Sequence, residues 1–128
     1  MDAFAQILKT MDLTFFAKGK HKITAEKLFD IKDAIFLDVR SKPENESVNF
    51  PLKIQSQCLH IPTDEIPGRL SEIPKDKAIG VFCSAGVRSA IVYAFLRAHG
   101  FENVKILTGG YETLFKALMP GQIWSSLK

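Results

Sequence analysis

The sequence predicts a single α/β domain in which a small parallel β-sheet is covered by helices on both faces. Two observations and one general rule of sheet topology predict this fold. Short apolar runs alternate with segments of helical periodicity along most of the 128 residues. The apolar runs are continuous rather than alternating, as in parallel strands that are buried on both faces. Parallel strands also need long crossover connections, so strands that alternate with helices indicate a sheet between two helical layers.

The composition is that of one globular domain. Hydrophobic residues make up 46% of the chain and charged residues 24%, and the sequence has no internal repeat. A net charge of +3 is too small to indicate a nucleic-acid-binding protein, so no nucleic-acid partner is expected. No apolar run reaches membrane-spanning length, and the residues around Asp2 lack the basic start of a signal peptide. We therefore expect a cytoplasmic protein with no membrane contact, in which Cys58 and Cys83 stay reduced.

Residues 1–21 are predicted to be an extension that packs on the domain. Apolar side chains recur there at the spacing of an amphipathic helix: Phe4, Ile7, Leu8 and Met11. Contact with a second copy of the chain is the alternative, which leaves a monomer or a weak dimer open. Residues 18–22 are basic and are predicted to be a solvated linker. The histidines, which share no metal-ligand spacing and receive no role, are His21, His60 and His99.

The domain itself is predicted over residues 22–120, with a tail over residues 121–128. Thr24 is a favourable N-cap for a short helix that ends near Asp30. The four apolar runs that are predicted as strands cover residues 34–39, 58–61, 78–82 and 104–107. Pro62 ends the second of these runs.

The connections between the strands are predicted from periodicity and from turn residues. Residues 41–57 are polar, contain two prolines and show little periodicity, so they are predicted to be irregular. Residues 63–73 are predicted to form one or two helical turns. A helix over residues 87–99 is apolar on most faces, which predicts that it is covered on both sides. A closing helix is predicted over residues 111–119.

The stretch with the clearest chemical content lies where the strand over residues 78–82 ends and the helix over residues 87–99 begins. It has the sequence Cys83-Ser84-Ala85-Gly86-Val87-Arg88-Ser89. Backbone N–H groups converge in such a loop, and the first turn of the helix adds unpaired N–H groups and a positive dipole end. Gly86 permits a positive φ, which suits a loop whose amides all point inward. The stretch is therefore predicted to hold an anion.

A cysteine at the centre of such a loop is predicted to ionise easily. Thiols at helix N-termini have pKa values well below the ordinary value, and the thiolate is the reactive form. Arg88 places a positive charge close to Cys83. The alternative is an inert cysteine in the core, which is a common place for a free thiol.

Asp38 and Arg40 end the strand over residues 34–39. Ligands bind at the carboxyl ends of strands in open α/β sheets, so both side chains could stand beside the Cys83 loop. A salt bridge that supports the loop without contact to a substrate is the alternative, and the sequence does not separate the two.

Three pieces of sequence in this order resemble a single-domain rhodanese-like sulfurtransferase. They are Leu37-Asp38-Val39-Arg40, then the loop Cys83–Ser89 with its pattern C-x-x-G-x-R-S, then Leu107-Thr108-Gly109-Gly110. The resemblance covers about residues 23–119. It implies the rhodanese α/β fold, with a parallel sheet in a three-layer arrangement, and it implies no metal and no cofactor.

The same resemblance implies a role for each matching residue. Cys83 matches the nucleophile that carries sulfane sulfur as a persulfide, and Ser84 to Ser89 match the loop that holds the outer sulfur atom. Asp38 and Arg40 match supporting residues at the strand end. The implied partners are a small sulfur donor such as thiosulfate and an acceptor that is a thiol, cyanide or a protein. One departure is that residues 49–54 replace the glycine-rich stretch that usually precedes the strand near Cys58.

Two other functions are left open by the sequence. One is a rhodanese-like module that carries sulfur or senses redox state without turnover. The other is an oxyanion enzyme of the phosphatase or arsenate reductase kind. The enzymes of that kind that resemble this fold have one residue more between cysteine and arginine than the four between Cys83 and Arg88. The shorter loop favours a single sulfur atom over a tetrahedral oxyanion.

Overall fold

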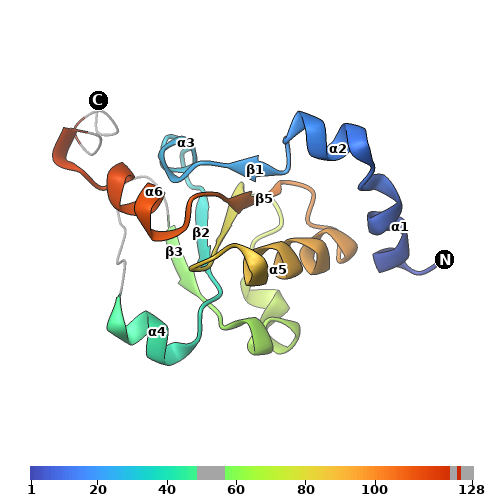
Figure 1. Cartoon of the computed structure of the whole chain (residues 1–128). Helices are drawn as coiled ribbons and strands as arrows, with labels where there is room; N and C mark the ends of the chain where they lie inside the picture. Colours follow the sequence, from blue (N-terminus) through green and yellow to red (C-terminus); the bar gives the residue numbers. More distant parts are fainter. Residues whose placement is uncertain (49–56, 122–123, 125–128) are drawn as a thin grey trace.

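A computed structural model describes residues 1–48, 57–121 and 124. These residues form three layers, with a parallel sheet between two layers of helices (Figure 1). The strands are β1 (Lys22–Ile23), β2 (Ile35–Asp38), β3 (Gln57–His60), β4 (Ile79–Phe82) and β5 (Val104–Leu107). They lie side by side in the order β1-β5-β4-β2-β3, and every neighbouring pair is parallel. The predicted parallel sheet is confirmed, with β4 at its centre. Because β4 is the central strand, the Cys83 loop lies at the middle of the carboxyl-terminal end of the sheet.

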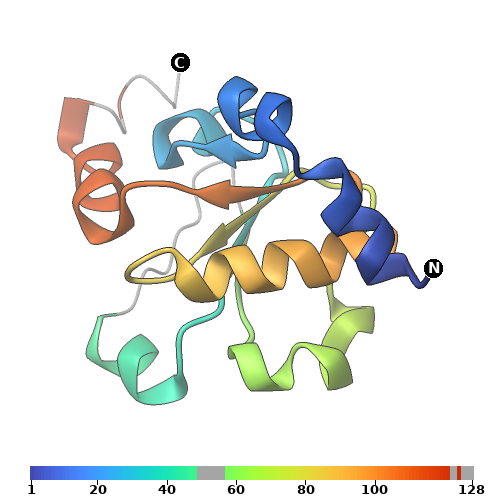
Figure 2. The ribbon, with the colours of Figure 1, turned by 45° about the vertical axis from the view of Figure 1, so that its right-hand side comes forward.

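Helices cover both faces of the sheet (Figures 1 and 2). The α-helices are α1 (Ala3–Thr10), α2 (Leu13–Lys18), α3 (Ala25–Phe29), α4 (Lys42–Ser47), α5 (Val87–Ala98) and α6 (Gly110–Ala117). Residues 63–73 form two short 3₁₀ helices, η1 (Thr63–Glu65) and η2 (Pro67–Glu72), close to the predicted helical turns. Thr24 caps α3, where its hydroxyl accepts a hydrogen bond from the Lys27 N–H group at 3.2 Å, as predicted.

The central strands divide the core into two clusters because successive side chains point to opposite faces of a sheet. Leu37 and Val81 belong to a cluster that includes Val92 and Leu96 of α5. Phe36 and Phe82 belong to the other cluster, with residues of α3 and α6. Cys83 lies in the first cluster and Cys58 packs against the second, so the two thiols lie on opposite faces of the sheet.

The N-terminal extension contains two helices where one was predicted. The carboxylate of Asp2 accepts a hydrogen bond from the Ala5 N–H group at 2.7 Å, and that of Asp12 accepts one from the Phe15 N–H group at 2.9 Å. Each aspartate thereby starts a helix of its own. Helix α1 packs against α5, as Figure 2 shows, so the predicted packing on the domain is confirmed.

Three details of the prediction are wrong in whole or in part. The side chains of Lys18, Lys20 and Lys22 are exposed as predicted, but residues 18–22 are not a linker throughout, because Lys18 ends α2, His21 is buried and Lys22 begins β1. Residues 41–57 are not irregular throughout, because α4 occupies Lys42–Ser47; residues 49–56, including the departure at 49–54, lie outside the described residues. Helix α5 is not covered on both sides, since Val87 and Ile91 are 67% and 59% exposed.

Among the described ranges, no helix has the length and hydropathy needed to cross a bilayer. The same residues contain no group of three or more histidine, cysteine, aspartate or glutamate side chains that could bind a metal ion.

Candidate active site

Cys83 lies directly after the central strand, at the base of a loop that leads into α5. Its side chain is 2% exposed. The sulfur atom accepts a hydrogen bond from the Gly86 N–H group at 2.9 Å and one from the Ser89 N–H group at 3.4 Å. The Ser89 Oγ atom lies 3.4 Å from the same sulfur atom. The predicted loop of inward-pointing amides is therefore present around the thiol.

These contacts lower the pKa of Cys83 from the ordinary thiol value of 9.0. Burial by itself raises the pKa, because it disfavours the charged thiolate. Hydrogen bonds from the side chain and backbone of Ser89, and from the backbone of Ala85 and Gly86, outweigh the burial. The cradle thus stabilises negative charge on a sulfur atom that is shielded from water.

Two glycines allow the loop to take this shape. Gly86 has φ = 92° and is the N-cap of α5, a conformation that other residues adopt only with strain. Gly110 begins α6 with φ = 53°, and a Cβ atom there would lie 2.5 Å from the Ser84 carbonyl oxygen. The turn after β5 therefore packs directly against the Cys83 loop. Gly110 is part of the glycine pair in the sequence, yet its contact with the loop was not predicted.

Removal of the Ser89 hydroxyl group tests the cradle. In Ser89→Ala we expect the pKa of Cys83 to rise, because a hydrogen bond to the thiolate is lost. Only the thiolate is alkylated, so the alkylation rate rises as the pH increases through this pKa, and the variant should react several-fold more slowly at neutral pH. The measurement is the pH dependence of iodoacetamide alkylation. Ser71→Ala, at an exposed serine of η2 outside the Cys83 loop, is the control. Coinciding profiles would rule out the role of Ser89.

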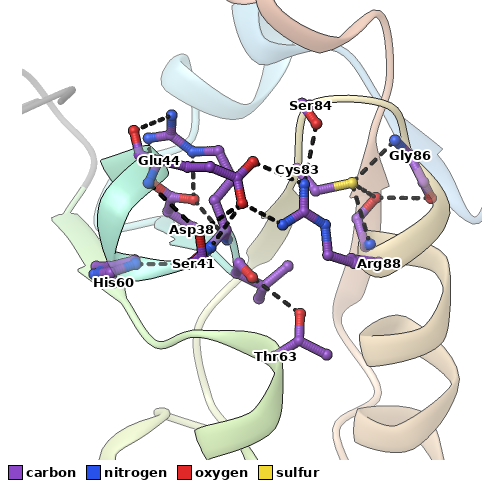
Figure 3. Close-up of polar contacts among 12 residues, drawn as sticks. Asp38, Ser41, Glu44, His60, Thr63, Cys83, Ser84, Gly86 and Arg88 are labelled. Atoms are coloured by element: carbon purple, nitrogen blue, oxygen red, sulfur yellow. Dashed lines mark hydrogen bonds and ion pairs between the residues drawn. The ribbon is translucent and has the colours of Figure 1, made fainter. Parts of the chain in front are cut away.

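Arg88 lies in the first turn of α5, and its guanidinium group is directed toward Glu44 of α4 (Figure 3). Its Nη1 and Nη2 atoms donate to the two carboxylate oxygens of Glu44 at 2.6 and 3.0 Å, and Nη2 also donates to Ser84 Oγ at 3.1 Å. The bond from Arg88, followed by the bond from Ser41, lowers the pKa of Glu44 to about 2. Arg88 is therefore held by a carboxylate as well as by the loop.

Asp38 and Arg40 form a buried ion pair beneath the site. Arg40 Nη2 lies 2.6 Å from one carboxylate oxygen of Asp38, and Arg40 Nε donates to the other oxygen at 2.9 Å. The guanidinium group also donates to the Glu44 carbonyl oxygen and to the Tyr111 hydroxyl group, at 3.3 and 3.1 Å. These contacts favour the supporting role for both residues. Arg40 joins the end of β2 to α4 and α6.

The Arg88–Glu44 pair leads to two predictions of opposite sign. Arg88→Ala should raise the pKa of Cys83, because a positive charge that interacts with the thiolate is lost. Glu44→Gln should lower the pKa of Cys83, because it removes the carboxylate that neutralises the guanidinium group. Alkylation as a function of pH measures both shifts. Equal profiles for both variants and the wild-type protein would make Arg88 a structural residue only.

Sequence reasoning brought together the loop residues and the supporting pair but missed Ser41, Glu44 and Tyr111. A signal for the first two was present. Ser41 and Glu44 form an S-x-x-E capping box: the Ser41 N–H group donates to Glu44 Oε1 at 3.1 Å, and the Glu44 N–H group donates to Ser41 Oγ at 3.4 Å. The Arg88–Glu44 pairing joins residues 44 positions apart and leaves no local pattern.

Comparison with known proteins shows the family of this chain. A family model described as the rhodanese-like domain matches residues 22–117. A sulfurtransferase from Allochromatium vinosum is 34% identical over 86 residues, which cover 67% of this chain and 76% of that protein. The structure of a rhodanese-related protein from Thermoplasma volcanium matches with a TM-score of 0.65 and 28% identity, over 78% of this chain and 95% of that one.

Other relatives are longer. A tRNA sulfurtransferase from Psychromonas ingrahamii is 32% identical over 101 residues, which cover 76% of this chain, and the chain spans only 20% of that protein's length. By its matching family model, its similar relatives and its five-stranded parallel sheet, this chain belongs to the rhodanese-like domain family, whose members include sulfurtransferases.

Proposed function

We propose that this protein is a rhodanese-type sulfurtransferase that moves sulfane sulfur from a small donor to a nucleophilic acceptor through a persulfide on Cys83. The observation that carries the proposal is the cradle around the sulfur atom, with N–H groups of Gly86 and Ser89 within 3.4 Å. The loop sequence resembles the catalytic loop of the family, and the lowered pKa of Cys83 favours the thiolate that the reaction needs.

The two half-reactions conserve charge and need no oxidant. With thiosulfate as donor, the Cys83 thiolate attacks the outer sulfur atom, a new S–S bond forms, and the S–S bond of thiosulfate breaks to release sulfite. With cyanide as acceptor, its carbon atom takes the outer sulfur atom, the persulfide bond breaks, and the Cys83 thiolate returns. Negative charge lies on sulfur at the loop in both steps. Preorganised donors at such a place contribute about 3 to 4 kcal/mol each to catalysis.

Steady-state kinetics test the proposal. Thiocyanate formation from thiosulfate and cyanide should follow a ping-pong pattern, because sulfite leaves before cyanide reacts. Double-reciprocal plots against thiosulfate at several cyanide concentrations should therefore be parallel. Intersecting lines would indicate a ternary complex and would contradict a persulfide intermediate.

A phosphatase activity is the sharpest alternative, and the loop argues against it. A tetrahedral oxyanion needs donors near 2.9 Å from each of its oxygens. The loop closes on the sulfur atom itself at 2.9 Å, and four residues separate Cys83 from Arg88. We expect no hydrolysis of p-nitrophenyl phosphate above that of Cys83→Ser, and only weak inhibition of sulfur transfer by phosphate.

Insertion of one glycine between Ala85 and Gly86 extends this test. It should weaken the protection of the persulfide and admit phosphate or arsenate to the enlarged loop. Phosphatase turnover by the unmodified chain that disappears in Cys83→Ser would overturn the sulfurtransferase assignment.

A further inference from the structure

A large pocket opens beside the Cys83 loop. Its volume is about 920 Å³. Its lining includes the loop residues Ser84 to Val87, one side of α5 and the end of β5. The N-terminal helices contribute three apolar side chains at the other end, from Met11, Phe15 and Phe16. In Figure 2, α5 runs from the loop toward α1. Because the loop and residues 11–21 both line the pocket, the pocket joins the proposed reaction centre to the N-terminal extension.

His21 is the unusual member of the pocket lining. Its side chain is 7% exposed, and within the described residues its Nδ1 atom has no hydrogen-bond partner. The ring is stacked on Phe15, with 4.4 Å between the ring centroids. An unpaired buried nitrogen atom is costly, and it is the kind of group that a ligand's polar atom satisfies. Burial, followed by the charge of Lys22, lowers the pKa of His21 and so favours the neutral imidazole.

The size of the pocket favours an organic ligand. Pockets of roughly 300 to 1,000 Å³ with mainly apolar walls and a few polar groups are typical of sites for organic molecules. Thiosulfate and cyanide are compact, strongly hydrated anions that would gain little from apolar walls such as Phe15, Phe16 and Ile91. A thiol with a carbon chain would bury apolar surface there, with about 0.8 kcal/mol for each buried methylene group.

We propose that this pocket binds the sulfur acceptor, and that the acceptor is an organic thiol with an apolar body of several carbon atoms and a polar atom that bonds to His21. The proposal rests on the proposed function. The acceptor thiol attacks the outer sulfur atom of the Cys83 persulfide, the Cys83 S–S bond breaks, and a new S–S bond forms. The proton of the thiol ends on the terminal sulfur atom of the product hydropersulfide, and Cys83 returns as the thiolate. No external oxidant or reductant takes part.

The N-terminal extension supplies much of this selectivity. Residues that match the family model begin at residue 22, whereas Met11, Phe15, Phe16 and His21 all precede it. The cysteine loop therefore belongs to the matched domain, while four of the nineteen residues that line the acceptor pocket lie before it. Phe15 and Phe16 of α2, together with Met11 in the preceding turn, form an apolar wall of the pocket.

Single-turnover kinetics test the acceptor. Protein loaded with thiosulfate and freed of excess donor is mixed with 2-mercaptoethanol or with 6-mercaptohexan-1-ol, and the rates of persulfide discharge are corrected for the thiolate fraction of each reagent. The longer thiol should react at least about tenfold faster, because its extra methylene groups are buried. Equal corrected rates would overturn the proposal.

Two pocket variants and one control variant test whether the preference for the longer thiol arises in this pocket. Ala90→Phe places a large side chain at an exposed pocket position and should remove the preference for the longer thiol. Ala3→Phe makes the same change on α1 outside the pocket lining and should keep it. His21→Phe retains an aromatic ring and should slow 6-mercaptohexan-1-ol by about tenfold while changing hexane-1-thiol little, since only the former offers a polar atom. Unchanged ratios in Ala90→Phe and His21→Phe would contradict the site.

A binding measurement separates this proposal from the proposed function. The thioether 6-(methylthio)hexan-1-ol cannot accept sulfur, so its binding to unloaded protein does not depend on a persulfide. Titration should shift the NMR signals of the His21 ring in the wild-type protein and in Cys83→Ser, but not in Ala90→Phe. Absence of a persulfide with binding intact would remove the sulfurtransferase assignment and the acceptor role, and would leave the pocket as a binding site for an organic ligand. Persulfide formation without binding would remove the acceptor pocket alone.

Discussion

Cys83→Ser should abolish thiocyanate formation from thiosulfate and cyanide, with a loss of more than about a thousandfold. The reason is that the serine hydroxyl group is a weak nucleophile in this cradle and cannot hold a sulfane sulfur atom in a persulfide. The substitution changes a single buried atom, so the fold should persist, as circular dichroism and a cooperative urea transition would show.

The matched control is the other cysteine. Cys58 packs on the opposite face of the sheet, so Cys58→Ala should keep the turnover and lose about 1 kcal/mol of stability through a small cavity. If Cys83→Ser keeps its turnover, the assignment of the nucleophile is wrong. If Cys58→Ala forms a persulfide but cannot discharge it, Cys58 is a resolving thiol.

Arg40→Ala should reduce the free energy of unfolding by about 3 to 5 kcal/mol. The side chain is fully buried, and its removal would leave the Asp38 carboxylate, which is 1% exposed, without its ion-pair partner. It would also remove the hydrogen bonds that Arg40 donates to the Glu44 carbonyl oxygen and the Tyr111 hydroxyl group. Urea denaturation measures the loss.

Arg69→Ala is the control for this prediction. Arg69 makes ion pairs with two carboxylates, from Glu65 and Glu72, at 3.1 and 2.8 Å, but its side chain is 34% exposed. Solvent-exposed pairs of this kind contribute about 0 to 1 kcal/mol. Equal losses of stability for Arg40→Ala and Arg69→Ala would show that the buried pair does not support the site.

The parts of the fold that could be predicted depend on local patterns. The runs Ala34–Val39 and Ala78–Phe82 contain enough consecutive apolar residues to indicate buried strands, and both form strands at the sheet centre. The loop at Cys83 could be predicted because a strand, a glycine and a helix start follow one another within a few residues. Its amides converge through backbone geometry, which the sequence order nearly determines.

Residues 41–48 show where the local patterns were misread. Pro43 was interpreted as a helix breaker, but at the second position of a helix proline loses no hydrogen bond, because the N–H group it lacks would be unpaired there. The capping box of Ser41 and Glu44 stabilises the start of the same helix. Helix α4 brings Glu44 to Arg88, so one misread proline concealed a contact of the candidate site.

Other features arise only from tertiary packing. His21 stands in a basic run that indicates a solvated turn, yet Phe15 and Phe16 cover its ring, with centroids 4.4 and 5.8 Å from it. The pocket beside Cys83 combines segments near residues 11–22, 84–94 and 106–111. No spacing in the sequence relates these segments, so neither the pocket nor the burial of His21 could be predicted.

Mass spectrometry of the intact protein after incubation with thiosulfate tests the central claim most directly. The wild-type protein and Cys58→Ala should each gain the mass of one sulfur atom, which cyanide should remove, and Cys83→Ser should gain none. A wild-type protein that gains no sulfur, or an added sulfur atom that persists in Cys83→Ser and is absent from Cys58→Ala, would contradict the persulfide on Cys83.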